Sequence, residues 1–172
     1  EEVEEPSCPD DKVKVKICNG SINHLDIWMR KGIKSKNTKL PLIIGSDASG
    51  IIVEVGNKIT DFKCGDEVVV QPGLFCQKCK ECITGNENFC IKYGILGETQ
   101  DGVHAEYVVL APINVYPKPE NITFSEAASM PLVFMTSYQM LIERAKVKKN
   151  DDVLVYGGTS GIGSAAIQIC KS

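Results

Sequence analysis

The sequence predicts a mixed fold, a β domain followed by the first βα unit of an α/β domain. Short strand-like runs separated by turn residues fill the first part of the chain. Four cysteines share one short segment, and an apolar run, a glycine-rich turn and a helical pattern follow one another near the C-terminal end. We therefore divide the chain into residues 1–119, with a cysteine lobe at residues 75–97, and residues 120–172.

Composition excludes several classes of protein. The 172 residues are 43% hydrophobic and 24% charged, which is too apolar for a disordered chain. The chain lacks a run of about 18 apolar residues, so we expect no membrane partner. The net charge is -3 and the lysines and arginines are spread among acids, so we expect no nucleic-acid partner. The acidic start lacks the apolar core of a signal peptide, which predicts a cytoplasmic protein.

The two ends of the sequence suggest that it is part of a longer protein. Residue 1 is Glu rather than Met, and Ser172 follows a helical pattern that has no terminating signal. We therefore expect the first domain to be incomplete at its N-terminus and the second to be truncated at its C-terminus.

Residues 12–17 predict a half-buried strand, because Val13, Val15 and Ile17 would share one face and three lysines the other. Further strands are expected at residues 51–55, 67–70 and 107–110. Short strands with turn signals between them indicate an irregular antiparallel β domain.

Helical signals occur in two places. Residues 23–31 predict a short helix that Asn23 caps and Gly32 ends. Thr123 and Glu126 fit a capping box that opens a helical pattern over residues 127–145, which Pro131 can bend.

The cysteine spacing is the strongest chemical signal in the sequence. Cys76, Cys79, Cys82 and Cys90 have a spacing that suits one tetrahedral Zn²⁺. Four protein ligands leave no open position, so such a zinc would be structural. An iron–sulfur cluster or two disulfides are the alternatives. The other cysteines, which we expect to be ordinary buried thiols, are Cys8, Cys18, Cys64 and Cys170.

The turn at residues 157–163 follows a predicted strand at residues 152–156 and precedes a predicted helix at residues 165–170. In that context a glycine-rich turn favours dinucleotide binding, because orphan N–H groups at a helix N-terminus attract a pyrophosphate. The alternative is simply a tight βα turn. The residue that separates NAD from NADP would lie about 20 residues beyond the glycines, past Ser172.

Together these motifs resemble the medium-chain dehydrogenase/reductase superfamily, which includes zinc alcohol dehydrogenases and quinone oxidoreductases. The matching segments are Ile22–Asp26, Gly45–Gly50, Val53–Gly56, Phe62–Val68 and Gly102–Tyr107. The resemblance implies a GroES-like catalytic domain followed by a Rossmann domain. It also implies hydride transfer between a small-molecule substrate and NAD or NADP, in a parent protein that forms a homo-oligomer.

The sequence departs from the family at the catalytic zinc. The positions that match the family's ligands are Asn23, Ser46 and Leu132, none of which is a good zinc ligand. We therefore expect one structural zinc per chain and no catalytic zinc. This moves the resemblance toward quinone oxidoreductase-like or enoyl reductase-like enzymes, which act on a carbonyl, a quinone or an activated alkene.

The resemblance implies catalytic roles for residues at the start of the first helix. Asn23, His24 and Asp26 are the candidates, and Trp28 matches an aromatic position near the cleft. Asn23 can instead be only a helix cap, His24 only a surface residue, and Asp26 only a partner of Arg30. Trp28 can equally belong to the core.

Cofactor-binding residues are expected in the second part of the chain. Ser160, Gly161 and Ile162 would present backbone N–H groups, and Thr136 would lie near the nicotinamide or only pack against a neighbour. The full cofactor-binding set is Thr136, Gly158, Ser160, Gly161, Ile162 and Gly163.

Two other functions stay open. One is a zinc-stabilised binding or structural module without catalysis, and the other is a zinc-dependent alcohol dehydrogenase with unusual ligands. Because one βα unit buries little apolar surface, we expect this chain alone to bind nicotinamide nucleotide poorly and to be inactive.

Overall fold

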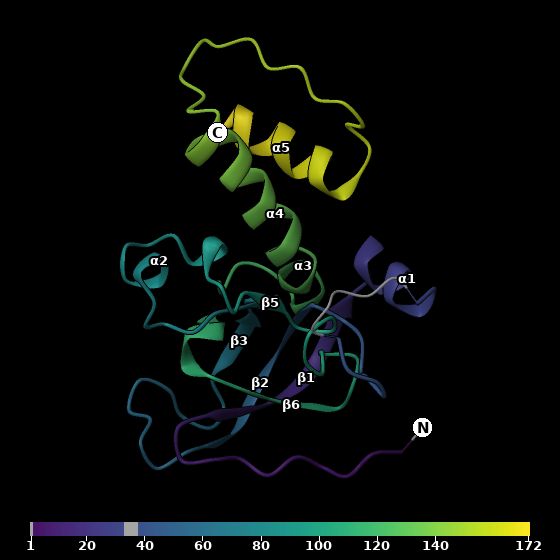
Figure 1. The fold of residues 1–172 in the computed structure, drawn as a ribbon, viewed down its shortest axis with the longest axis vertical. Coiled ribbons are helices and arrows are strands. Elements are labelled where there is room, and N and C mark those ends of the chain that lie inside the picture. Colours follow the sequence, from purple (N-terminus) through teal and green to yellow (C-terminus); the bar gives the residue numbers. More distant parts are fainter. Residues whose placement is uncertain (1, 33–37) are drawn as a thin grey trace. The chain divides into compact units, whose positions relative to one another are not determined.

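The computed structural model describes residues 2–32 and 38–172 (Figure 1). Two compact units are present, Glu1–Ser129 and Met130–Ser172. The division falls after α3 (Phe124–Ala128) rather than at the expected residue 119, because α3 packs on the sheet of the first unit. Ser49 Oγ fixes this packing by donating a hydrogen bond to the Phe124 carbonyl oxygen at 2.6 Å.

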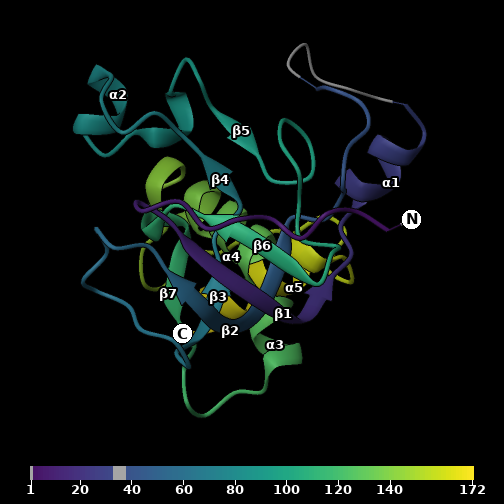
Figure 2. The ribbon, with the colours of Figure 1, turned by 90° about the horizontal axis from the view of Figure 1, so that it is seen from below.

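The first unit is built on a five-stranded antiparallel sheet with the strand order β6-β1-β2-β3-β7, which Figure 2 shows side by side. The strands are β1 (Val13–Ser21), β2 (Asp47–Val55), β3 (Glu67–Val70), β6 (Tyr107–Leu110) and β7 (Val115–Pro117). The predicted antiparallel β domain is confirmed. The strands expected at residues 67–70 and 107–110 have the observed bounds, whereas β2 begins four residues before the expected start.

The core of this unit is a cluster of branched aliphatic side chains on one side of the sheet. Val13 and Val15 are fully buried, as the alternation predicts, and they pair with Leu110 and Val108 of β6. Ile52 lies opposite Val15 on β2 and is also fully buried. Burial of such side chains stabilises the sheet by about 1.5–3 kcal/mol each.

Lys14 corrects the expected half-buried strand, because its side chain is only 9% exposed. The extended N-terminal segment covers it: Glu5 Oε1 accepts a hydrogen bond from Lys14 Nζ, and Glu54 lies 3.7 Å from the same nitrogen. The ammonium also lies over the Tyr107 ring. The hydrogen bond with Glu5 raises the pKa of Lys14 above its ordinary value.

The predicted short helix is confirmed as α1 (His24–Arg30). Asn23 is its N-cap residue, and the Asn23 backbone N–H donates to Asp26 Oδ2 at 2.7 Å. Gly32 follows with φ +82°, the left-handed conformation that commonly ends a helix.

The cysteine lobe leaves the sheet after β3 and contains only short elements. These are β4 (Gly73–Leu74), α2 (Lys80–Ile83), the 3₁₀ turn η1 (Glu87–Phe89) and β5 (Gly94–Ile95). Asn114, in the 3₁₀ turn η2 (Pro112–Asn114), ties the lobe to the sheet, since its side-chain nitrogen donates to the carbonyl oxygens of Gln71 and Gly73 at 2.9 and 2.7 Å.

The capping box before α3 is confirmed. Thr123 Oγ1 accepts the Glu126 N–H at 3.2 Å, and Glu126 Oε2 accepts the Thr123 N–H at 2.8 Å. The helical pattern expected over residues 127–145 is interrupted after α3, and Pro131 occupies the first turn of the next helix, where its missing N–H costs nothing.

The second unit consists of α4 (Pro131–Tyr138), the π-helical turn η3 (Gln139–Arg144) and α5 (Gly161–Lys171). The prediction of a strand at residues 152–156 was wrong, since this segment forms no strand in the structure. Leu154 and Tyr156 are 80% and 90% exposed. A strand needs a neighbour to complete its hydrogen bonds, and the described residues provide none beside this segment. Across the described ranges, no helix is long and apolar enough to cross a membrane.

Candidate metal centre and catalytic face

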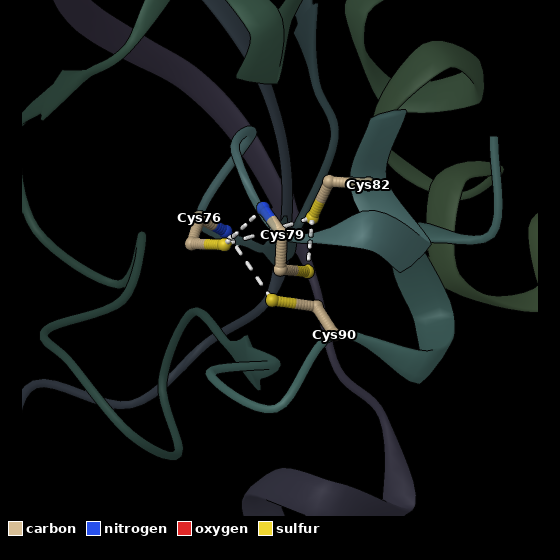
Figure 3. Close-up of side chains that lie close together, drawn as sticks. All are labelled: Cys76, Cys79, Cys82 and Cys90. Carbon is tan, nitrogen blue, oxygen red and sulfur yellow. Dashed lines mark hydrogen bonds between the residues drawn. The ribbon is translucent and has the colours of Figure 1, made fainter. Parts of the chain in front are cut away.

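The four clustered cysteines converge on one point of the lobe (Figure 3). Cys79 caps α2, Cys82 lies within α2, and Cys90 follows η1. All four sulfur atoms lie within 4.8 Å of one another, with Cys76–Cys82 and Cys79–Cys82 at 3.9 and 3.4 Å. Four sulfurs around one Zn²⁺, each at about 2.3 Å, would be about 3.8 Å apart. The donor set therefore fits one tetrahedral zinc ion.

Backbone N–H groups point at these sulfurs. Cys76 Sγ accepts the Cys79 N–H at 3.3 Å, and Cys90 Sγ accepts the N–H groups of Cys76 and Lys92 at 3.4 and 3.3 Å. The turn that allows this geometry has Gln77 at φ +60°. Such N–H groups stabilise thiolates, the form that binds metal.

The pKa values of Cys76 and Cys82 are shifted in opposite directions. Backbone hydrogen bonds from Lys78 and Cys79 lower the pKa of Cys76 to about 6. Burial, together with the neighbouring cysteines, raises the pKa of Cys82 to about 12. Four closely spaced sulfurs resist simultaneous ionisation, because the thiolates repel one another. A dication bound between them would offset this repulsion and stabilise the fully ionised lobe.

Elsewhere in residues 2–32 and 38–172, no second group of three or more metal-ligating side chains occurs. The remaining cysteines contradict the expectation of buried thiols. Cys18, Cys64 and Cys170 are exposed and Cys8 is half-buried. Cys18 lies on β1 and Cys170 on α5, whereas Cys8 lies before the first strand and Cys64 in a turn before β3. Their burial could not be inferred from residue type.

The structure brings two of the three positions that match the family's catalytic zinc ligands close together. Ser46 is fully buried, and its hydroxyl donates to the Leu96 carbonyl oxygen at 2.8 Å. In the neighbouring residue, Asp47 Oδ2 accepts a hydrogen bond from Asn23 Nδ2 at 2.9 Å. Leu132 belongs to the second unit. A hydroxyl committed to a carbonyl and an apolar side chain offer no metal ligand.

Asp26 is 3% exposed and accepts one backbone hydrogen bond on each oxygen, from Asn23 N at 2.7 Å and from Gly45 N at 3.0 Å. It forms no ion pair with Arg30 in the described part of the chain. The carboxylate thus fastens the start of α1 to the segment that carries Ser46, and a catalytic role for it stays a prediction.

His24 and Trp28 lie one turn apart on the exposed surface of α1. Their ring centroids are 5.9 Å apart, and Trp28 is 48% exposed. Trp28 is therefore not a core residue of the first unit. Both rings are available to a ligand on this side of α1, together with Asn23 at its start.

In the second unit, the glycine-rich turn folds onto the start of α5. Ser160 caps the helix, its Oγ accepting the Gly163 N–H at 3.0 Å, and its own N–H donates to the Gly157 carbonyl at 2.9 Å. A Cβ on Gly163 would lie 2.2 Å from that carbonyl oxygen. The expectation that Ser160 presents a free N–H is therefore wrong. Gly161 and Ile162 hold N–H groups in the first turn of α5, where a helix leaves its backbone donors free to receive an anion.

Gly158 and Thr136, two other predicted cofactor-binding residues, lie at packing contacts of the second unit. A Cβ on Gly158 would lie 3.2 Å from Ile167 Cδ1, so this glycine serves close packing on α5. Thr136 is half-buried on α4, next to Ser137, whose hydroxyl donates to the Ile162 carbonyl at 3.0 Å. Binding roles for both stay predictions.

Sequence reasoning missed Asp47 and His104. Asp47 lies 24 residues from the Asn23 side chain that it holds, and no spacing rule connects them. The ring of His104 lies directly over Gly45, where a Cβ would come within 2.4 Å of Cδ2. The glycine at residue 45, with φ +100°, was the available signal that another group approaches the backbone there.

Comparisons with known proteins assign the family. Residues 9–120 match the alcohol dehydrogenase GroES-like domain, so the chain belongs to this family, within the medium-chain dehydrogenase/reductase superfamily. Its curated relatives include the crotonyl-CoA carboxylase/reductase of Cereibacter sphaeroides, 35% identical over all of this chain and 42% of the relative. An alcohol dehydrogenase of Geobacillus stearothermophilus is 35% identical over 99% of this chain and 50% of its own.

Solved structures agree with this assignment. A crystal structure of an NAD-dependent alcohol dehydrogenase superposes with a TM-score of 0.96 and 44% identity, over 99% of this chain and 50% of the other. The chain thus spans about half the length of the proteins that it matches.

Proposed function

We propose that the chain provides the substrate-binding domain and the first βα unit of an NAD- or NADP-dependent oxidoreductase. The protein would transfer hydride to or from a small carbonyl, quinone or activated alkene, with one structural zinc and no catalytic zinc. The family supports the redox class. Its relatives include one named for crotonyl-CoA, an activated alkene, and others named as alcohol dehydrogenases.

The observation that carries the zinc-independent part of the proposal is the buried Ser46–Leu96 hydrogen bond. A metal at the family's catalytic position would need a ligand where this structure has a hydroxyl already committed to a carbonyl oxygen at 2.8 Å. The Asp26 carboxylate, one anionic alternative, has a backbone donor on each oxygen. Recruiting either group would break a buried hydrogen bond, which costs about 1–3 kcal/mol.

Without a metal, the residues of this chain would orient the substrate. Asn23 has its amide nitrogen held by Asp47, so the orientation of its side chain is fixed before substrate arrives. His24 supplies a group that can donate or accept a proton, and Trp28 supplies an apolar wall beside it. In this scheme the nicotinamide, when bound, supplies the hydride or accepts it.

Nucleotide would be held weakly by this chain alone. The turn has one of its N–H groups, that of Ser160, occupied by the Gly157 carbonyl, and among the described residues no strand lies beside residues 152–156. A completed parallel sheet would order this segment and the turn that follows it. The activity therefore belongs, in our proposal, to the full-length protein.

Metal analysis and turnover together test the proposal. Purified full-length protein should contain about one zinc per chain and oxidise NADH or NADPH in the presence of crotonyl-CoA or p-benzoquinone. Exchanging Asn23 for Ala should lower turnover by about 10-fold or more through loss of an orienting hydrogen bond. Asn57→Ala, at an exposed site, is the matched control.

Three results would contradict it. Two zinc ions per chain, with alcohol oxidation abolished by a chelator, would establish the catalytic-zinc alternative. A full-length protein that binds neither nucleotide would favour a zinc-stabilised module without catalysis. Unchanged turnover in Asn23→Ala would remove Asn23 from the site.

A further inference from the structure

The first unit contains a pocket that the proposed hydride transfer does not use. Its volume is about 530 Å³, and it opens between α1 and the backbone that precedes β2. The lining residues are Ile22, Asp26, Ile27, Arg30, Lys31, Ile44 and His104. A volume of this size suits a small organic molecule.

Most of the pocket and the proposed catalytic face lie on different sides of α1. Successive residues of a helix are rotated by about 100°, so Asp26 and Arg30 point roughly opposite to His24 and Trp28, whereas Lys31, seven residues after His24, lies on the same side as His24. Variants of Arg30 therefore test the pocket without altering the face that carries His24 and Trp28.

The wall of the pocket is rigid. Asp26 ties α1 to Gly45 through a 3.0 Å hydrogen bond, and the His104 ring lies on Gly45, where a Cβ would leave no room for it. His104 Nε2 is also 3.2 Å from the Ser21 carbonyl oxygen, which fixes the ring in its plane. These contacts hold the opposing walls of the pocket at a constant separation.

The charge of the lining is positive. Arg30 and Lys31 form no ion pair with any described acid, whereas other lysines of this unit, Lys14 and Lys118, are paired with glutamates. Among the described residues of the lining, Asp26 is the one acid, and its two oxygens already accept backbone hydrogen bonds. An incoming anion would thus meet two uncompensated cations and a carboxylate that is 97% buried and turned to the backbone.

Three isoleucines lie beside these charged residues and His104 in the lining. Ile22, Ile27 and Ile44 contribute aliphatic side chains, and Ile22 and Ile27 are 77% and 40% exposed, although isoleucine is usually buried. An apolar wall beside free cations suits a ligand with a hydrocarbon body and an anionic head. A guanidinium binds a carboxylate through two parallel hydrogen bonds, which favours Arg30 as the residue that receives the head.

We propose that this pocket binds a small carboxylate with a short aliphatic chain, its head on Arg30 and Lys31 and its body against the three isoleucines. Binding at this pocket does not require the proposed hydride transfer, and the ligand is a free small carboxylate.

Titration of the zinc-loaded 172-residue chain with hexanoate tests the proposal, with amide NMR signals of Ile27, Gly45 and His104 as the readout. Hexanoate should shift these signals in a saturable manner. Hexan-1-ol has the same chain length and no charge, and its affinity should be lower than that of hexanoate by about 10-fold or more. Inorganic phosphate, which has the charge and no hydrocarbon body, should also bind more weakly than hexanoate.

Variants locate the head and the body. Arg30→Gln and Lys31→Gln should each weaken hexanoate binding by about 10-fold, the effect of one charge-assisted hydrogen bond. Ile44→Ala should lower the affinity for hexanoate and leave the affinity for phosphate unchanged. Lys58→Gln removes the same charge from an exposed site outside the lining and should leave both affinities unchanged.

Several results would overturn the proposal. Equal affinity for hexanoate and hexan-1-ol would show that Arg30 and Lys31 do not bind the carboxylate and interact only with the C-terminal end of α1. Equal affinity for phosphate and hexanoate would exclude the apolar body. The absence of saturable shifts, or equal weakening by Lys58→Gln, would exclude the site altogether.

Discussion

The side-chain amide of Asn23 donates a hydrogen bond to the Asp47 carboxylate, and the two atoms are 2.9 Å apart. Asp47 is 1% exposed and Asn23 is half-buried, so this bond lies at the edge of the interior of the first unit. It joins the residue before α1 to the start of β2. The contact therefore fixes both the entry of the helix and the orientation of the Asn23 amide.

Replacing Asp47 by Ala should lower the free energy of unfolding by about 0.5–1.5 kcal/mol, because the half-buried Asn23 amide loses its acceptor. Exchange of the Asn23 side-chain hydrogens with solvent, followed by NMR, should become faster. The pair of Asn57 and Asp10, at 3.1 Å on the exposed surface, is the control. Asp10→Ala should change neither the free energy of unfolding nor the exchange rate of the Asn23 amide. An equal loss of stability in Asp47→Ala and Asp10→Ala would show that the burial of Asp47 adds nothing to the strength of its contact.

Exchanging Cys82 for Ser should abolish zinc binding, because the hydroxyl is a poor replacement for a thiolate in this tetrahedral site. Metal content measured by mass spectrometry should fall from about one zinc per chain to a small fraction. Protease cleavage within the lobe should increase as its short elements lose their common anchor. Cys170→Ser, at an exposed position on α5, should retain the metal; loss of zinc in that variant would contradict the assignment.

Exchanging Gly163 for Ala should destabilise the second unit, because the new Cβ would lie 2.2 Å from the Gly157 carbonyl oxygen. The expected cost is about 1–3 kcal/mol, as for an overpacked site. Hydrogen exchange of the amides of α5 measures it. Ser164→Ala, at the next and exposed position of the helix, should have little effect, so similar exchange rates in the two variants would refute the close approach.

The capping box gives the first unit a pH-dependent contribution. Hydrogen bonds from the Thr123 backbone and hydroxyl lower the pKa of Glu126 below its ordinary value of 4.5. A lowered pKa means that the contribution is present above pH 4.5 and is lost as the pH falls through the folded value. Chemical unfolding should therefore show wild type to be more stable than Glu126→Gln at neutral pH. The difference should shrink at acidic pH, while Glu120→Gln serves as the control; a difference that persists at low pH would exclude the carboxylate as its cause.

Local patterns predicted the first unit well. The alternation around Val13 and Val15, the cap at Asn23 and the capping box at Thr123 depend on neighbouring residues, and the structure has all three. The convergence of the four cysteines also follows from spacing within one short segment.

Most failed predictions depend on a segment outside the pattern that was used. Burial of Lys14 depends on Glu5, and residues 152–156 form no strand because the described residues place none beside them. The Ser160 N–H is a local exception, since the Gly157 carbonyl three residues before it occupies it when the turn closes. At the site, neither the Asp47–Asn23 bond nor the position of His104 over Gly45 follows from residue spacing.

The covered position of Lys14 has a consequence for the chemical reactivity of the chain. Acylating reagents attack an amine only when it is deprotonated and accessible, and the contact with Glu5 opposes both conditions by covering the nitrogen and raising its pKa. Lys14 should therefore be acylated later than an exposed lysine such as Lys58. Its labelling by a reagent of this kind would report when the N-terminal segment leaves the sheet.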